Sequence, residues 1–170
     1  MAESTSENIA KPYLSAVDIS DLPEAHIKHP FNPRSDVFLK RLAPVFGLER
    51  LALYVARVPP GKESFAFHRH ERDEEFLIIL SGKGRAEIGK DVIEVGPGDI
   101  MGFPAPYGPP HHLTNPYTQD LIYLMGGESS GFDIAHFPKL RRKLIFSETG
   151  IRALSDEEGQ QLSFDDWLSE

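Results

Sequence analysis

The sequence predicts an all-β sandwich or barrel in a chain of 170 residues, a length typical of one domain. Short segments rich in Val, Ile, Leu and Phe recur between Leu51 and Met125, at a spacing typical of strands. Gly and Pro clusters separate these segments, and both residues favour turns because of their backbone geometry. No long helical period precedes residue 150, so the repeated strand–turn pattern indicates packed sheets or a closed barrel.

Turn signals set the limits of the expected strands. Pro59-Pro60-Gly61 ends the first strand, and Gly89-Lys90-Asp91 has the form of a hairpin turn between two others. Residues 104–110 are so rich in Pro that we expect a stiff loop there. The expected strands are residues 51–58, 65–70, 76–80, 85–88, 92–95, 100–103, 111–114 and 121–125.

The two ends of the chain differ from this central part. Residues 1–40 contain Pro and His in loose order and predict an irregular N-terminal arm, with a short edge strand near 13–19. The barrel is expected over residues 41–130 and a C-terminal extension over 131–170. In that extension, Ser155-Asp156-Glu157-Glu158 has the form of a capping box and predicts a short helical tail.

Composition excludes several classes of function. The net charge of −8 argues against nucleic acid and against anionic membrane, because both require a basic surface. The chain has no cysteine, so any metal must be held by nitrogen and oxygen atoms. Neither a signal peptide nor a membrane span is apparent, and the expected location is the cytoplasm.

One short stretch has the residue types of a metal site. His68 and His70 point to the same side if the backbone is a strand, because side chains alternate with a period of two. Glu75 comes just before the next apolar run and can reach the same space. Two imidazoles and one carboxylate make most of a first-row metal site, and His111 or His112 offers a fourth ligand.

The spacing in this stretch resembles the first motif of the cupins, a family of small β-barrel proteins. That motif has a Gly, His-x-His, three or four residues, a Glu, six residues and a Gly. Here His68-x-His70 is followed by four residues, Glu75, six residues and Gly82. Six residues separate Gly61 from His68, one more than in the family pattern.

The second cupin motif is matched at both ends and differs in the middle. Gly98, five residues and Pro104 fit the pattern, as do His111, three residues and Asn115. The central Pro-x-Gly is replaced by the longer Pro-rich segment 104–110. This segment borders the expected pocket, so the family motif does not define the shape of the pocket mouth. The resemblance covers roughly residues 51–126.

The resemblance implies a fold and a ligand set. The fold would be the double-stranded β-helix, or jelly-roll, with the metal inside the barrel. The implied ligands are His68, His70, Glu75 and His111, and the cofactor would be one divalent first-row metal: Fe, Mn, Zn, Ni, Co or Cu. His112 would point to the opposite face, as a structural residue or as support for a ligand residue.

Three other residues are candidates for the pocket. Strand alternation allows Arg57 and Tyr123 to face inward and orient an anionic or carbonyl substrate, although either side chain could equally face solvent or another layer. Tyr107, in the stiff loop, could gate the entrance or simply pack as an aromatic residue.

Two classes of function follow. The first is a metal-dependent enzyme acting on a small molecule, because reactions associated with cupins include dioxygenation, isomerisation, decarboxylation and lyase chemistry. No cluster of Lys and Arg marks a phosphate site, which weakens a sugar-phosphate isomerase reading. The alternative is a non-catalytic module that binds a metal or small ligand. A homodimer is expected, since open β-sandwiches leave edge strands exposed.

Overall fold

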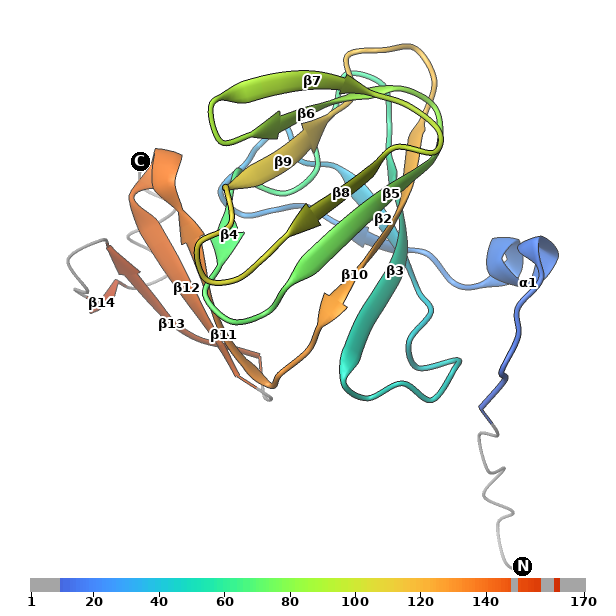
Figure 1. Cartoon of the computed structure of the whole chain (residues 1–170), viewed down its shortest axis with the longest axis horizontal. Coiled ribbons are helices and arrows are strands. Elements are labelled where there is room, and N and C mark those ends of the chain that lie inside the picture. Colours follow the sequence, from blue (N-terminus) through green and yellow to red (C-terminus); the bar gives the residue numbers. More distant parts are fainter. Residues whose placement is uncertain (1–9, 148–149, 157–160, 163–170) are drawn as a thin grey trace, which may run out of the picture.

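The computed structural model describes residues 10–147, 150–156 and 161–162, and its strands pair antiparallel in three sheets (Figure 1). The strands are β1 (Ala25–Ile27), β2 (Val37–Arg41), β3 (Leu51–Val58), β4 (Arg69–His70), β5 (Glu75–Ser81), β6 (Gly84–Ile88), β7 (Asp91–Val95), β8 (Ile100–Phe103), β9 (His111–Thr114), β10 (Leu121–Glu128), β11 (Phe132–Phe137), β12 (Arg142–Ser147), β13 (Gly150–Asp156) and β14 (Gln161–Leu162). The sheets run in the orders β1-β2-β3-β10-β5-β8, β14-β13-β12-β11-β4 and β7-β6-β9. Mostly β structure is therefore confirmed.

The main core lies between the six-stranded and the three-stranded sheets. It is built by alternation along each strand: in β5, Leu77 and Ile79 are buried, whereas Phe76 and Leu80 on the other face are 37% and 47% exposed. The hairpin of β6 and β7 pairs through β6 with β9 and covers the inner face of β5 and β8 (Figure 1). The buried set is Val37, Ala56, Val58, Leu77, Ile79, Ala86, Val95, Met101, Phe103, Leu113, Leu121 and Tyr123.

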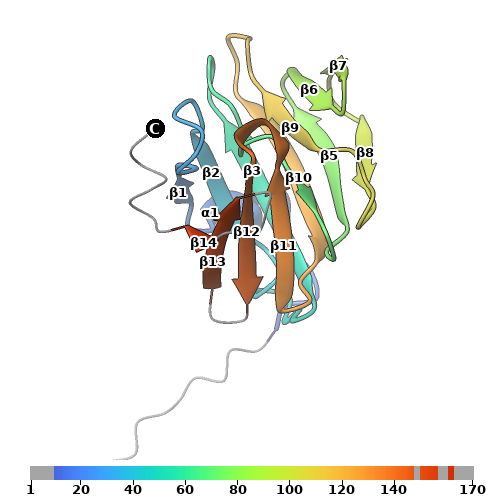
Figure 2. The same ribbon diagram turned by 90° about the vertical axis from the view of Figure 1, so that its left-hand side faces the viewer.

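The five-stranded sheet makes a second wall, which stands in front of β3 and β10 in Figure 2. Its core is a smaller cluster of Ala66, Ala135, Phe137 and Leu144. Strand β4 joins this sheet by pairing with β11, where His70 lies opposite Ala135. The expected strand over 65–70 is thus regular only at Arg69–His70, and it connects the central motif to the C-terminal part of the chain.

The N-terminal arm is more regular than the sequence suggested. The predicted edge strand near 13–19 is wrong, because Ala16–Asp21 form the helix α1. Its N-cap is Ser15: the backbone N–H of Asp18 donates to Ser15 Oγ at 3.1 Å, and Asp18 Oδ2 accepts from the Ser15 N–H at 2.8 Å. Further along, β1 and β2 pair with each other, and β2 pairs with β3.

The C-terminal extension adds strands to the second sheet. The expected helix at Ser155 is not found, since Ser155 and Asp156 end strand β13, which pairs with β12 along its length. The rest of that prediction, over residues 157–160 and 163–170, lies outside the described residues. Within the described part of the chain, no helix has the length and apolar character needed to cross a membrane.

Candidate metal centre

Three of the four predicted ligand residues lie at strand ends, and the fourth, His68, lies just before β4. His70 ends β4, Glu75 begins β5 and His111 begins β9. His68 and His111 form an isolated antiparallel bridge, in which the His68 N–H donates to the His111 carbonyl at 3.1 Å and the His111 N–H donates to the His68 carbonyl at 2.8 Å. The main chain therefore holds these two imidazoles next to each other.

The side chains converge on one carboxylate oxygen. Glu75 Oε2 lies 3.8 Å from His68 Nε2, 3.4 Å from His70 Nε2 and 3.3 Å from His111 Nε2. The potential ligand atoms of His68, His70 and Glu75 all lie within 4.8 Å of one another. Metal–ligand bonds of about 2.1 Å at right angles put neighbouring ligand atoms about 3 Å apart, so this spacing is close to that of a coordination shell.

Buried polar atoms without hydrogen bonds support the fit to a cation. Among the described residues, His70 Nε2 and Glu75 Oε2 are both buried and make no hydrogen bond. Leaving such groups unsatisfied in the protein interior typically costs about 1–3 kcal/mol each. A cation bound between them would satisfy both atoms at once, and neutral imidazole with carboxylate is a donor set that first-row divalent metals accept.

Each imidazole is oriented from behind. His68 Nδ1 donates to the Ala66 carbonyl at 2.8 Å, and His70 Nδ1 hydrogen-bonds to the carboxylate of Asp133. The His111 ring stacks on Phe103, with 3.4 Å between ring centroids. The two hydrogen bonds fix the tautomers of His68 and His70, whereas the stacking on Phe103 fixes only the ring plane of His111. All three Nε2 atoms lie toward Glu75.

Burial and charge set the protonation states in the group. Burial alone would raise the pKa of Glu75, but the three nearby imidazoles outweigh it and lower that pKa to about 2. Burial lowers the pKa of His68 to about 3. Burial also acts to lower the pKa of His70, yet the hydrogen bond to Asp133 and the charge of Glu75 raise it overall. Because of Asp133, the imidazole of His70 is more basic than that of His68.

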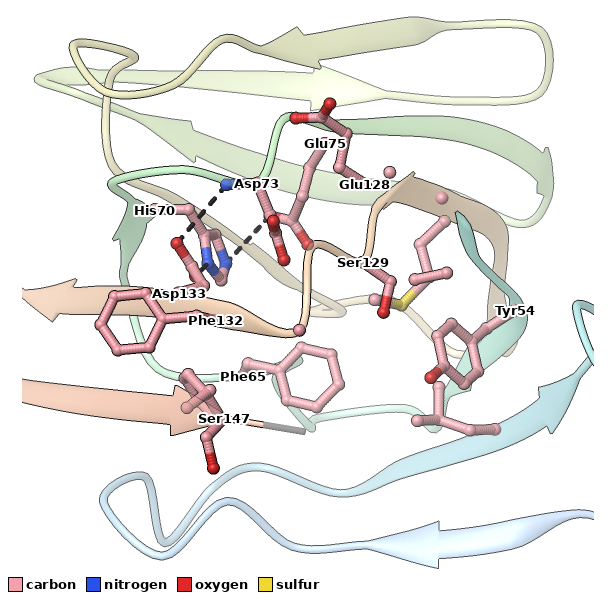
Figure 3. Close-up of a pocket in the computed structure, with 17 residues that line it drawn as sticks. Tyr54, Phe65, His70, Asp73, Glu75, Glu128, Ser129, Phe132, Asp133 and Ser147 are labelled. Carbon is pink, nitrogen blue, oxygen red and sulfur yellow. Dashed lines mark hydrogen bonds and ion pairs between the residues drawn. The ribbon is translucent and has the colours of Figure 1, made fainter. Parts of the chain in front are cut away.

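A cavity of about 480 Å³ opens beside His70 and Glu75 (Figure 3). It lies between the β3–β10 side of the first sheet and the β11–β12 side of the second. Its walls combine four carboxylates with four aromatic rings: Asp73, Glu75, Glu128 and Asp133, with Tyr54, Phe65, Phe132 and Phe146. This volume is typical of a site for a small molecule.

Tyr123 and Arg57 cannot both face the pocket. In the pairing of β10 with β3, Tyr123 lies opposite Ala56 and Ile122 lies opposite Arg57, so Tyr123 and Arg57 are on opposite faces of the sheet. Tyr123 is the inward one: it is buried, and burial together with the charge of Glu75 raises its phenol pKa. Of the two orientations that the sequence allowed for Arg57, the one facing the pocket is wrong.

Arg57 instead binds the N-terminal arm and a loop on the outer face. Its guanidinium donates to Glu24 at 2.7 Å and to Asp120 at 3.3 Å, and it lies over the Phe38 ring at 4.1 Å. Tyr107 is 95% exposed, so its ring does not cover the pocket. Both residues lie apart from the imidazole group.

His112 points away from His111, as strand alternation requires. Its Nε2 contacts Glu87 at 2.9 Å, and its ring packs edge-on against Phe67. Lys139 joins this cluster by donating to Glu87 at 2.6 Å. His112 therefore packs in a separate cluster with Glu87, Lys139 and Phe67, on the face opposite His111.

Asp133 is the site residue that the sequence analysis missed. It is 4% exposed, and its Oδ1 accepts a hydrogen bond from the Arg72 N–H at 2.9 Å while Oδ2 contacts His70. A signal was present: Asp133 has the same strand parity as Ala135 and Phe137, both of which are buried. A carboxylate in such an inward row requires a partner.

Comparisons with known proteins agree with the fold. Residues 54–127 match the family model described as the cupin domain. A crystal structure of a protein from Acidithiobacillus ferrooxidans, named as a candidate sugar phosphate isomerase, is 29% identical and superposes with a TM-score of 0.81, covering 89% of this chain and 96% of that one. No curated protein matches the sequence significantly.

Two more solved structures show the same fold at lower identity. A sugar phosphate isomerase of the cupin superfamily from Silicibacter pomeroyi is 21% identical, with a TM-score of 0.78 and coverage of 91% of this chain and 98% of that one. A predicted oxalate decarboxylase from Thermotoga maritima is 20% identical, with a TM-score of 0.55 and coverage of 65% and 95%. The fold is thus a β-barrel of the cupin type. Residues 54–127 thus form a cupin domain, as the motif spacing predicted.

Proposed function

We propose that this cupin is a metal-dependent enzyme that acts on a small molecule in the 480 Å³ cavity. The observation that carries the proposal is the convergence of three imidazole Nε2 atoms on Glu75 Oε2, beside that cavity. Cupin domains commonly bind a transition metal, which adds support.

His68, His70, Glu75 and His111 would hold one divalent first-row metal ion. Such an ion supplies Lewis-acid chemistry, because it polarises a carbonyl or hydroxyl oxygen of the substrate. Four protein ligands on an ion that accepts six leave positions for a substrate with two oxygen donors. Fe, Mn, Zn, Ni, Co and Cu all accept this set of nitrogen and oxygen donors.

The protein's own groups would position the substrate. Tyr54, Phe65 and Phe132 provide flat apolar walls that exclude water, and Ser129 adds a hydroxyl at the edge of the cavity. The phenol of Tyr123 is protonated at neutral pH, and burial raises its pKa further. Asp133 holds the His70 ring and its proton on Nδ1, away from the substrate side.

An isomerase-like reaction has the most support among the cupin chemistries. The protein that is 29% identical over most of both chains is named as a candidate sugar phosphate isomerase. Dioxygenation would need the same ligand set, so oxygen uptake by the iron-loaded protein separates the two reactions. The rival function is metal or ligand binding without catalysis, and it predicts no turnover with any divalent metal.

Two adjacent histidines provide a matched test of metal binding. We expect the purified wild-type protein to hold close to one equivalent of a transition metal by elemental analysis, and His111→Ala to lose most of it. His112→Ala, one position along on the opposite face, should keep it. Equal metal content in the two variants, or a wild-type protein that takes up no metal at any loading, would exclude the proposed centre.

We also propose a homodimer. The outer face of the six-stranded sheet carries exposed apolar side chains beside its β8 edge, where Leu80 is 47% and Ile100 is 70% exposed. Pairing with a second copy would cover such side chains. Light scattering at micromolar concentration should give about twice 19.0 kDa, and a monomer mass would overturn the dimer.

A further inference from the structure

The charges lining the cavity are of one sign. Four carboxylates line it, whereas none of its described lining residues is a lysine or an arginine. Arg72 lies beside one of the walls, with its guanidinium 5.8 Å from the Phe132 ring centroid. Arg72 stacks there against a wall residue and is not itself part of the lining.

Two of these carboxylates have a place at the metal centre and two do not. Glu75 and Asp133 lie with the imidazole group, and their charges would match those of a divalent ion. Asp73 and Glu128 also line the cavity, Asp73 next to Asp133, and neither carboxylate makes an ion pair with a described Lys or Arg (Figure 3). The cavity beyond the metal would therefore be negative even with the ion bound.

The backbone holds these two carboxylates at the cavity rim. The Ser130 N–H donates to Asp73 Oδ1 at 3.3 Å, and the Glu74 N–H donates to Glu128 Oε2 at 3.3 Å. The two bonds join the segment before β5 to the last residue of β10 and to the turn after it, so they fix the two acids on one side of the opening. Each carboxylate keeps oxygen lone pairs with which it can accept hydrogen bonds from a ligand.

The aromatic walls agree with this charge. Tyr54, Phe65, Phe132 and Phe146 present ring faces and edges to the cavity. Aromatic rings beside carboxylates attract cations and accept the apolar faces of neutral molecules, but they offer nothing to a phosphate. Phosphate recognition normally uses Arg, Lys or helix N-terminal N–H groups.

We propose that the ligand of this cavity is an unphosphorylated small molecule, uncharged or cationic, and that a positive charge on the part that lies next to Asp73 and Glu128 strengthens binding. The inference rests on the proposed function for the location of the site. The proposed ligand therefore differs from the sugar phosphate in the name of the Acidithiobacillus ferrooxidans protein. A sugar phosphate would place its doubly negative phosphate next to the carboxylates of Asp73 and Glu128.

The test compares ligands that share a carbon scaffold and carry different charges. Calorimetric titrations of the metal-loaded protein would use three- to six-carbon aldoses and ketoses, each as free sugar, amino sugar and monophosphate. The comparison is made for the sugar scaffold that binds best. We expect its free or amino form to bind at least about tenfold more tightly than its monophosphate. A monophosphate that binds as tightly, or no binding by any unphosphorylated member, overturns the inference.

Charge-neutralising variants show which residue causes the preference. Glu128→Gln should reduce the discrimination against the monophosphate to about a third of its wild-type value. Glu94→Gln, which removes a carboxylate of β7 that pairs with Lys83, should leave the discrimination unchanged. An unaltered preference in Glu128→Gln, or an equal effect of both substitutions, would remove the role of the rim charges.

Metal analysis of the same samples keeps the two proposals apart. If the wild-type protein holds metal but prefers monophosphates, the charge inference fails and the metal centre stands. If it holds no metal yet still prefers unphosphorylated ligands, the enzyme proposal fails and the charge inference stands.

Discussion

Asp133 and His70 are 63 positions apart in the sequence, yet the Asp133 carboxylate accepts a hydrogen bond from His70 Nδ1. The pairing of β11 with β4 brings them together, with Ala135 opposite His70. The contact turns His70 Nε2 toward Glu75 Oε2, 3.4 Å away. Asp133 is thus a positioning residue for the proposed metal centre.

Replacing this carboxylate should weaken metal binding without abolishing it. In Asp133→Asn, the side chain keeps its size but loses the charge that orients the His70 ring. Loss of such a supporting group typically lowers metal affinity about 10–100-fold. Competition with a chelator of known affinity measures the change. Asp91→Asn, in the exposed β6–β7 hairpin, is the control, and equal affinities in the two variants would contradict the role of Asp133.

Metal retention should fall as the pH falls, and His70 should be protonated before His68. A metal must displace the proton from each imidazole. The pKa of His70 is raised above 6.5 by Asp133 and Glu75 against the effect of burial, whereas burial lowers the pKa of His68 to about 3. Protons therefore compete at His70 near neutral pH. We expect metal to remain after dialysis at pH 8 and to be lost at pH 5, and full retention at pH 5 would contradict an imidazole-held ion.

His29 should make the fold less stable in mild acid. Its ring packs among Phe31, Phe65 and Phe137, and burial lowers its pKa from 6.5 to about 4. Between those values the unfolded chain binds the proton more readily than the folded one, so stability is lost as the pH falls through 6.5 toward 4. The loss attributable to His29 is about 2–3 kcal/mol.

Urea unfolding at pH 7 and pH 4.5 measures this loss. His29→Phe should show a smaller drop between the two pH values than the wild-type protein. Phe31→Leu, a substitution in the same cluster, should lower stability by a similar amount at both pH values. An identical drop in His29→Phe and the wild-type protein would exclude His29 as the cause.

Substitution of two glycines of the first motif should distinguish the cost of backbone strain from the cost of a steric clash. Gly82 has φ +77° and Gly61 has φ +73°, but a Cβ on Gly82 would lie 2.1 Å from the Asp120 carbonyl oxygen, whereas one on Gly61 would meet nothing within 4 Å. Gly61→Ala should cost about 1–2 kcal/mol, the strain of a left-handed residue. Gly82→Ala should cost about 3 kcal/mol or more, because the backbone must also move. Urea midpoints measure both, and equal costs would contradict the clash.

The central strands and the imidazole group could be predicted because their signals are local. Alternating apolar residues and Gly–Pro turns predict strands such as 76–80, and a His-x-His pair places two imidazoles on one side of any strand. The residues that the sequence grouped as one site, His68, His70, Glu75 and His111, do lie together.

The remaining features depend on pairing between distant segments. Asp133 becomes a site residue only through the β4–β11 pairing, and the choice between Arg57 and Tyr123 depends on the β3–β10 register. At Ser155, a local capping pattern competes with the long β12–β13 ladder, and the ladder prevails. At Ser15, by contrast, the local cap forms and decides the helix α1.

The reciprocal backbone bonds between His68 and His111 have a consequence for engineering. Because these bonds involve only main-chain atoms, the locations from which the two side chains project do not depend on what those side chains are. Exchanging either imidazole for a carboxylate or an amide should therefore alter metal preference while the scaffold stays in place. The backbone of the barrel should therefore allow the metal-ligand residues to be substituted one at a time.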